Sequence, residues 1–342
     1  MNKKIKVIIA GIVVAAAVVG FGIFRYNVAV KNKNEVKIAD QSSTYKEVKY
    51  VYNDGINKPV DVTIKSAPKR AVTLSQFMTE TLLSLGLGDR MVGTALLDNP
   101  ILPEYKEAYD KIPQLKVTEG HQISKESFLA LKPDFASGWL QSLSAKGVGS
   151  PEELEQEGIA PYVESALQGN ATIEDVYKDY DQLGKIFNVE DRAQKVVADM
   201  KEQIKEVEDR NKTVPEDKKP SVLIYDALDK DAYVVGGGFA NNLITLAGGK
   251  NIFGDLKNQW NTVSFESIAA KNPDIIVVTK YLSETQSLEE KINALKTNPA
   301  FKNVNAVKNN KIFAIDLADL SPGIRAPKAI KEMNNMFYGE AK

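Results

Sequence analysis

Short apolar runs alternate with amphipathic stretches along most of the chain. Runs typical of β-strands occur at 71–75, 134–139, 221–225 and 274–280, and a stretch of helical period follows the first of them up to Leu85. The run at 274–280 is apolar at consecutive positions, which is typical of a strand covered on both faces. Strands that alternate with helices in this way predict parallel βαβ units.

Two other patterns predict a hairpin and a long helix. Alternating apolar residues at 48–52 and 60–64 flank Asn53-Asp-Gly, a combination that indicates a β-hairpin. Apolar residues then recur every three or four positions between Val189 and Asn211, and a helix of that length would measure about 35 Å. It is either an ordinary surface helix or a stiff brace between two lobes. A last helix is predicted at about 324–338.

One segment of the sequence occurs twice. Ser124-Lys-Glu-Ser-Phe-Leu-Ala-Leu-Lys-Pro-Asp134 returns as Ser264-Phe-Glu-Ser-Ile-Ala-Ala-Lys-Asn-Pro-Asp274, with Ser, Glu, Ser, Ala, Pro and Asp in register. In each half a second similar pair, Leu82–Gly93 and Leu243–Gly254, precedes it. Two related lobes imply a cleft between them, and such clefts are preferred ligand sites.

These patterns divide the chain into five parts. A length of 342 residues suits about two domains of ~100–200 residues. We expect an N-terminal α/β lobe at 45–172, an inter-lobe helical segment at 173–212 and a C-terminal α/β lobe at 220–342. Residues 1–25 are expected to form a membrane anchor or signal segment, and the polar residues 26–44 a linker.

The N-terminal segment favours an uncleaved anchor. Lysines in the first six residues precede an uncharged apolar run from Val7 to Phe24, which approaches the ~17–25 residues that span a bilayer. The positive charges ahead of it place the following chain outside the cell, on the cell membrane. The alternative is a signal peptide cleaved near Ala15–Ala17, which would leave a very short apolar core. The chain has no cysteine and hence no acylated lipoprotein cysteine.

Composition argues against several classes of function. Lys and Arg total 44 against 45 for Asp and Glu, so no basic excess favours nucleic acid as a partner. His121 is the only histidine, which excludes a multi-histidine cage for a bare metal ion. No Gly-x-Ser-x-Gly elbow is present. We therefore expect neither catalysis nor a resident metal or cofactor.

Four motifs together resemble solute-binding proteins of ABC importers. They are Pro68–Ser75, Thr79–Arg90, the first repeat ending in Lys132-Pro-Asp, and Ala247–Phe253. Within these proteins, the chain is most similar to the helix-braced class that carries iron-siderophore, haem or cobalamin. The similarity extends from about Tyr45 to the C-terminus. The resemblance implies two Rossmann-like lobes that are joined by a rigid α-helix, with a ligand cleft between them. It also implies that the protein is a monomer and delivers its ligand to a permease that works with an ATPase. The lipoprotein cysteine of this class is missing, and the N-terminal span would replace it.

In that class a glutamate on each lobe commonly docks to basic residues of the permease. Glu266 matches the position in the second lobe. For the first lobe we favour Glu152, because Ser150-Pro-Glu-Glu153 indicates a capping box that leaves Glu152 pointing outward. Glu126, the repeat counterpart of Glu266, is the alternative. Each could equally be a surface charge, and Glu266 could stabilise the N-terminus of its helix.

Ligand contacts are expected in the loops at the carboxyl ends of the strands. Aromatic side chains there would suit a large, partly apolar chelate or macrocycle, although each could instead be core. Arg325 could hold an anionic ligand or form an ion pair, and His121 could line the cleft, ligate haem or be solvated. The candidates are Phe77, Met78, His121, Trp139, Tyr225, Trp260, Tyr281 and Arg325.

The sequence thus predicts the extracellular binding component of an ABC importer for a ferric siderophore-type complex. Cobalamin or haem is the alternative ligand within the class. A bilobal ectoenzyme is the alternative of another class, because fold does not determine function.

Overall fold

A computed structural model describes residues 45–55, 58–118, 122–227 and 231–339. The predicted anchor or signal segment, the linker 26–44 and His121 lie outside these residues. No helix in the described part of the chain is both long and apolar enough to cross a membrane.

The first lobe is built on a small parallel sheet. The predicted hairpin is confirmed, because β1 (Val48–Tyr52) pairs antiparallel with β2 (Val60–Ile64). The strands of the parallel sheet are, in spatial order, β4 (Met91–Thr94), β3 (Ala71–Leu74), β7 (Phe135–Gly138) and β8 (Ala160–Tyr162). The other strands and α-helices described in this lobe are α2 (Gln76–Ser84), α3 (Lys106–Tyr109), β5 (Val117–Thr118), β6 (Gln122–Ile123), α4 (Lys125–Ala130) and α5 (Pro151–Gln156).

The second lobe has a mixed sheet rather than a fully parallel one. Its strands are, in spatial order, β12 (Trp260–Val263), β10 (Ala232–Val235), β9 (Ser221–Ala227), β13 (Ile275–Lys280) and β14 (Ile312–Asp316), with β11 (Lys250–Asn251) beside β9. Strand β13 is parallel to both of its neighbours, but β10 is antiparallel to β9 and β12. Only four residues join β9 to β10, which is too short for the crossover that a parallel pair needs.

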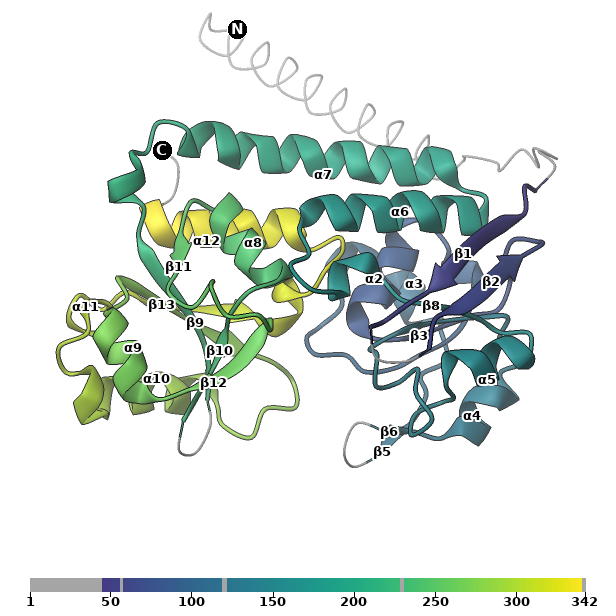
Figure 1. Cartoon of the computed structure of the whole chain (residues 1–342), viewed down its shortest axis with the longest axis horizontal. Coiled ribbons are helices and arrows are strands. Elements are labelled where there is room, and N and C mark those ends of the chain that lie inside the picture. Colours follow the sequence, from purple (N-terminus) through teal and green to yellow (C-terminus); the bar gives the residue numbers. More distant parts are fainter. Residues whose placement is uncertain (1–44, 56–57, 119–121, 228–230, 340–342) are drawn as a thin grey trace, which may run out of the picture. The chain divides into compact units, whose positions relative to one another are not determined.

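Helices cover both faces of the second sheet (Figure 1). They are α8 (Phe239–Leu246), α9 (Phe265–Lys271), α10 (Leu288–Thr297), α11 (Asn305–Lys308) and α12 (Ala326–Tyr338). Along β9 the side chains alternate, so that Val222 and Ile224 pack toward α8 and α12, while Leu223 and Tyr225 pack toward α9, α10 and α11. The continuous apolar pattern of β13 has the same cause, because helices cover both faces of the sheet there as well. The predicted strand covered on both faces is therefore confirmed.

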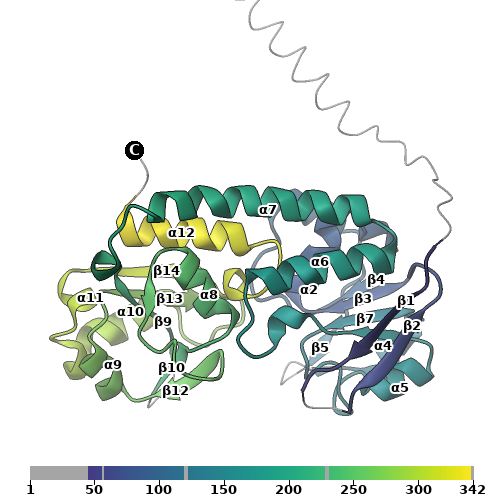
Figure 2. The same cartoon turned by 45° about the horizontal axis from the view of Figure 1, so that its top comes forward.

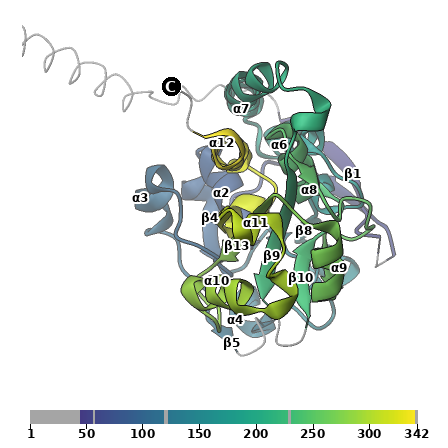
Figure 3. The same cartoon turned by 90° about the vertical axis from the view of Figure 1, so that its left-hand side faces the viewer.

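Two helices, not one, connect the lobes. Helix α6 (Ile173–Phe187) ends at Asn188, which adopts the left-handed conformation, and α7 (Glu190–Asn211) follows at once. Helix α7 packs along α6 and along α12, above both in Figures 2 and 3. At its far end the Asn211 Nδ2 atom donates to the Leu246 carbonyl oxygen at 2.9 Å. Helix α7 therefore touches elements of both lobes.

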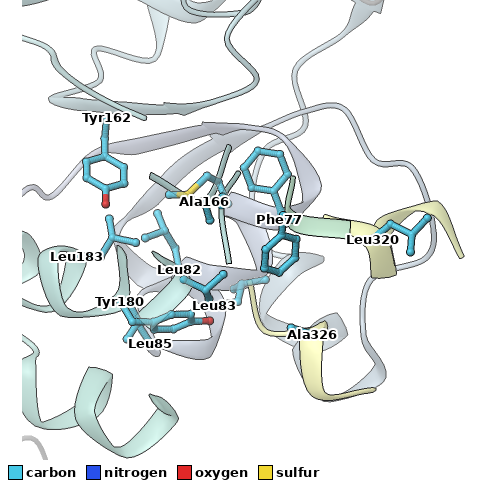
Figure 4. Close-up of a cluster of buried hydrophobic side chains, with 14 of the residues drawn as sticks. Phe77, Leu82, Leu83, Leu85, Tyr162, Ala166, Tyr180, Leu183, Leu320 and Ala326 are labelled. Atoms are coloured by element: carbon cyan, nitrogen blue, oxygen red, sulfur yellow. The ribbon is translucent and has the colours of Figure 1, made fainter. Parts of the chain in front are cut away.

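The two lobes share one apolar core. The larger cluster of buried side chains contains residues of β3, β7, α2 and α6 together with residues of β9, α8 and α12, and α7 covers it with Ala193, Met200, Ile204 and Val207. Figure 4 shows part of it, in a view where Phe77 of α2 lies between Leu82 of the same helix and Leu320 of the second lobe. The long helix thus closes a core that both sheets help to build.

The sequence repeat corresponds to a repeated structural unit. Ser124 and Ser264 each cap a helix by accepting from the backbone N–H three residues later. Asp134 then accepts from the backbone N–H of Lys69 and Arg70, just before β3, and Asp274 accepts from the N–H of Ser221, where β9 begins. In both lobes the aspartate that ends the repeat therefore ties the strand that follows it, β7 or β13, to the neighbouring strand of the main sheet, β3 or β9.

Candidate functional site

A cavity of about 180 Å³ lies where the two lobes meet. The first lobe contributes Asp98 and Trp139 to its wall, and the second lobe contributes the rest. Its lining side chains are Asp98, Trp139, Asp226, Tyr233, Gln259, Trp260, Leu317, Leu320 and Ser321. We refer to this cavity as the cleft.

Aromatic rings form two of its walls. Trp260 stacks on Tyr233 with ring centroids 5.2 Å apart and an interplanar angle of 15°. Across the cleft, Trp139 meets the buried Phe77 edge to face, with centroids 4.7 Å apart. Trp139, Tyr233 and Trp260 are each half-buried, so part of each ring remains accessible to a ligand. Flat apolar faces of this kind bind planar or partly apolar molecules.

A buried lysine forms an ion pair with the cleft-lining Asp226. The Asp226 carboxylate accepts from Lys291 Nζ at 2.8 Å, and the same ammonium group donates to Glu284 at 2.7 Å and to the Thr279 carbonyl oxygen at 3.0 Å. The Lys291 side chain is only 2% exposed and lies over the Tyr281 ring. Burial lowers the pKa of Lys291, but its hydrogen bonds to Asp226 and Glu284 outweigh burial and raise it overall. Lys291 is therefore charged.

Arg325 is part of a buried ion pair and does not line the cleft. Its Nη2 atom donates to Glu80 Oε1 and to the Pro100 carbonyl oxygen, both at 2.7 Å, and its Nη1 atom donates to Asp319 at 3.0 Å. Arg325 is 4% exposed and Glu80 is 1% exposed. Of the two roles that the sequence left open for Arg325, the structure shows the ion pair.

The other predicted ligand contacts lie in different surroundings. Trp139 and Trp260 line the cleft. Met78 is fully buried and Tyr225 is 2% exposed, so both belong to the core, because α2 and β9 are covered on the sides where these residues lie. Phe77 supports Trp139 from the core, and Tyr281 is half-buried beside Lys291. His121 lies outside the described residues.

Sequence reasoning missed Asp98, Asp226, Tyr233 and Gln259. The expectation that ligand contacts lie at the carboxyl ends of strands could have identified two of them. Asp98 follows β4, and Asp226 lies near the carboxyl end of β9. Tyr233 reaches the cleft only because β10 is antiparallel to β9, which the pattern did not predict. In the described part of the chain, no three histidine, cysteine, aspartate or glutamate side chains are grouped to hold a metal ion.

The three candidate docking glutamates are exposed and occupy equivalent positions near helix N-termini. The predicted capping box at Ser150 is present, with Glu153 accepting from the Ser150 N–H at 3.0 Å, and Glu152 beside it is exposed. Glu266 is likewise exposed next to the start of α9, and Glu126 accepts from the Ser124 hydroxyl at 2.7 Å. Helices α4, α5 and α9 lie on the side of the molecule away from α7 (Figure 1).

Comparison with known proteins decides the family. A family model described as periplasmic binding protein matches residues 72–318, which is most of the chain. The chain belongs to the periplasmic binding protein family. The crystal structure of a periplasmic binding protein from Veillonella parvula shares 30% identity and a TM-score of 0.80, and covers 87% of this chain and 100% of that one.

Two curated relatives of this periplasmic binding protein specify the class. An uncharacterised ABC transporter substrate-binding lipoprotein, YvrC of Bacillus subtilis, is 29% identical over 81% of this chain and 82% of its own length. The vitamin B12-binding protein of Vibrio campbellii is 24% identical over 81% of this chain and 92% of its own length. The resemblance to ABC-importer substrate-binding proteins of the siderophore, haem and cobalamin class is therefore confirmed. Proteins of this kind bind small molecules and work with a permease and an ATPase.

Proposed function

We propose that this substrate-binding protein captures a ferric siderophore-type complex in the cleft and delivers it to the permease of an ABC importer. The observation that carries the proposal is that Trp139 and Trp260, from different lobes, line the same cavity. A chelate between them would touch both lobes at once. Binding alone is proposed, with no chemical step.

The aromatic walls suit such a ligand. A siderophore wraps its metal in organic groups, so its outer surface is bulky, polar in places and apolar in others. The half-buried rings of Trp139, Trp260 and Tyr233 offer apolar faces, while Gln259 and Ser321 offer hydrogen-bonding groups. Binding sites of this composition take orientation from a few polar groups and much of their affinity from apolar contact.

Tryptophan fluorescence tests the proposal directly, because the chain has only two tryptophans and both line the cleft. Titration with a ferric trihydroxamate should quench the emission saturably. Trp139→Phe and Trp260→Phe should each weaken binding about fivefold, since Phe keeps one ring and loses the rest of the indole contact, which costs ~1 kcal/mol. Tyr338→Phe, an exposed aromatic at the end of α12, is the matched control. No response to any iron chelate, haem or cobalamin would exclude the proposal.

Cobalamin is a second candidate, favoured by the vitamin B12-binding relative. A corrin ring is flat and bordered by amide groups, which would fit between aromatic walls. Competition decides between the two candidates. If cobalamin displaces the ferric chelate at equimolar concentration and the reverse fails, the corrinoid is the ligand.

We also propose that Glu152 and Glu266 dock to the permease. Both are exposed, on different lobes, and neither carboxylate has a hydrogen bond or ion pair within the described residues. Glu266→Ala and Glu152→Ala should each abolish uptake while the affinity for the chelate stays unchanged. Glu202→Ala on the exposed face of α7 is the control, and Glu126→Ala tests the alternative in the first lobe. Normal uptake by the Glu266 variant would refute the docking role.

We propose that residues 1–25 retain the protein at the outer face of the cell membrane. The apolar run from Val7 to Phe24 supports this role, and the absence of cysteine leaves no residue for lipid attachment of the lipoprotein kind. Membrane fractionation of the full chain, with mass spectrometry of its N-terminus, tests the proposal. A mature protein that begins near Ala17 and is found in the medium would support the signal-peptide alternative instead.

A further inference from the structure

A larger cavity lies beside the cleft. It has a volume of about 440 Å³, against about 180 Å³ for the cleft. Asp98 lines the cleft, and Leu97, the residue before it, lines the larger cavity. Because consecutive Cα atoms are only about 3.8 Å apart, the two cavities are neighbours. We refer to the larger cavity as the side pocket.

Both lobes border the side pocket, as they border the cleft. Most of its described wall comes from the first lobe, from the end of β4, the segment before β5 and β5 itself, and Ser283 of the second lobe contributes as well. The backbone N–H of Leu282 donates to the Asp98 carbonyl oxygen at 2.7 Å. This contact between the lobes therefore lies where the two cavities meet.

The wall of the side pocket is mainly apolar. None of its described lining residues is charged. Val117 in this wall is 37% exposed, and Leu282, which precedes Ser283, is 63% exposed. Exposed apolar side chains that gather at a cavity indicate a binding site, whereas scattered ones do not. The apolar residues that line the side pocket are Ala95, Leu96, Leu97, Tyr109, Leu115 and Val117.

An unusual backbone conformation places two leucines in this wall. Leu96 adopts the left-handed conformation, with a φ of 61°, which residues other than glycine rarely adopt. In an extended strand consecutive side chains point to opposite faces, so only one of Leu96 and Leu97 could line the pocket. With the left-handed turn at Leu96, both line it. Strain of this kind gathers at ligand sites, where the surrounding structure maintains it.

The cleft alone is small for a ligand. Sites for small molecules usually enclose ~300–1,000 Å³, so the cleft lies below that range and the side pocket lies within it. A ferric chelate between Trp139 and Trp260 would therefore extend beyond the cleft, and the side pocket is an apolar space next to it.

From this arrangement we infer that the side pocket is a further subsite, which binds an aliphatic arm of the chelate held in the cleft. This inference rests on the proposed function. It specifies the ligand as an amphiphilic chelate, with a polar metal centre for the cleft and an acyl or alkyl chain for the side pocket. The chain would cover the apolar wall and remove it from water.

A matched pair of ligands tests the inference with the wild-type protein. A linear ferric trihydroxamate with a terminal amine is acylated with either an acetyl or a hexanoyl group. The two forms have the same metal centre and the same net charge, and they differ only in the length of the acyl chain. Each CH₂ group that becomes buried strengthens binding about fourfold, so the affinity for the hexanoyl form should be higher by about tenfold or more. Quenching of the two tryptophans measures both affinities.

Two variants assign the effect to the side pocket. Val117→Thr replaces a methyl group by a hydroxyl group of similar size, and Leu97→Asn makes the neighbouring wall polar. Each should reduce the gain in affinity from the acetyl to the hexanoyl form by about threefold or more. Val51→Thr, the same change at a strand residue that is 57% exposed and lines neither cavity, should leave the gain unchanged. Circular dichroism shows whether each variant is folded, and Val117→Thr decides alone if Leu97→Asn does not fold.

The outcomes separate the inference from the proposed function. If the acetyl and hexanoyl forms bind equally, or the hexanoyl form binds more weakly, the subsite is overturned while the binding function stands. If the gain is as large in Val117→Thr and Leu97→Asn as in the wild type, the chain binds elsewhere and the subsite is again overturned. If no ferric chelate binds, the inference falls together with the proposed function.

Discussion

Glu164 is a buried carboxylate without a base beside it in the described structure. It is 2% exposed, and its Oε2 atom has no hydrogen-bond partner there. Burial, and then the neighbouring Asp179 carboxylate, raise the pKa of Glu164 well above its usual value. Asp179 itself accepts from the Tyr162 hydroxyl at 2.8 Å and from the Ser165 N–H at 2.9 Å. The pKa of Asp179 is raised as well, so Glu164 is the member of this pair with the more strongly raised pKa.

This pKa predicts how stability depends on pH. The pKa of Glu164 is higher in the folded than in the unfolded chain, so above the unfolded pKa of about 4.5 the folded protein binds more protons and stability falls as pH rises. Glu164→Gln removes the titrating group. We expect its melting temperature to decline less between pH 5 and pH 8 than that of the wild type. A decline as steep as in the wild type would show that Glu164 does not titrate as stated, and Glu202→Gln is the control.

Arg325 shows why individual side chains were harder to predict than the elements that carry them. Its partner Asp319 is six positions away, but Glu80 is 245 positions away in a helix of the other lobe. The local pattern placed Arg325 in the first turn of the last helix, which in the structure begins one residue later, at Ala326. It contained no information that α2 would pack against that loop, so an anion site and an ion pair could not be distinguished. The burial of Met78 and Tyr225 could not be predicted for the same reason, because burial depends on contacts from distant parts of the chain.

At the scale of elements, local signals were sufficient. The hairpin of β1 and β2, the capping box of α5 and the extent of α7 all depend on residues within a few positions of one another, and each was predicted. The break between α6 and α7 was not, because Asn188 interrupts an otherwise continuous helical pattern by a single left-handed residue. The antiparallel β10 was missed because strand direction depends on the pairing partner as well as on the strand's own sequence.

The two repeat aspartates make a prediction at this scale. Asp134 accepts from two backbone N–H groups just before β3, both at 2.8 Å, and Asp274 accepts from one at the start of β9, at 3.0 Å. Because hydrogen bonds to a charged group contribute ~1.5–3 kcal/mol each, Asp134→Ala and Asp274→Ala should each lower the free energy of unfolding by about 2 kcal/mol. Urea denaturation measures this, with the exposed Asp217→Ala as control. If only one of the two variants lowers the free energy of unfolding, the two aspartates do not play equivalent roles.

At the scale of the whole molecule, a buried ion pair crosses from one lobe to the other. Glu80 lies on α2 and Arg325 precedes α12, and both are almost fully buried. Removing one partner of such a pair leaves an uncompensated buried charge and typically costs ~3–5 kcal/mol. We therefore expect Glu80→Gln to lower the free energy of unfolding by about 3 kcal/mol, measured by urea denaturation.

The paired replacement Glu80→Leu with Arg325→Met provides the comparison. It removes both charges, and apolar replacements of a buried pair are often close to neutral. The double variant should therefore be more stable than Glu80→Gln. If instead Glu80→Gln costs less than about 1 kcal/mol, the pair does not hold the lobes together.

The apolar core that α7 closes has a consequence for any attempt to divide the protein. Each sheet supplies only part of that core, and α6, α7, α8 and α12 supply the rest from both sides. A fragment that ends after α6, or one that begins at α7, would leave a broad apolar face in contact with water. Neither half should fold when expressed alone, whereas the two halves mixed together should associate and recover the cleft. The two lobes thus share a similar sequence segment, but we expect them to fold only as one unit.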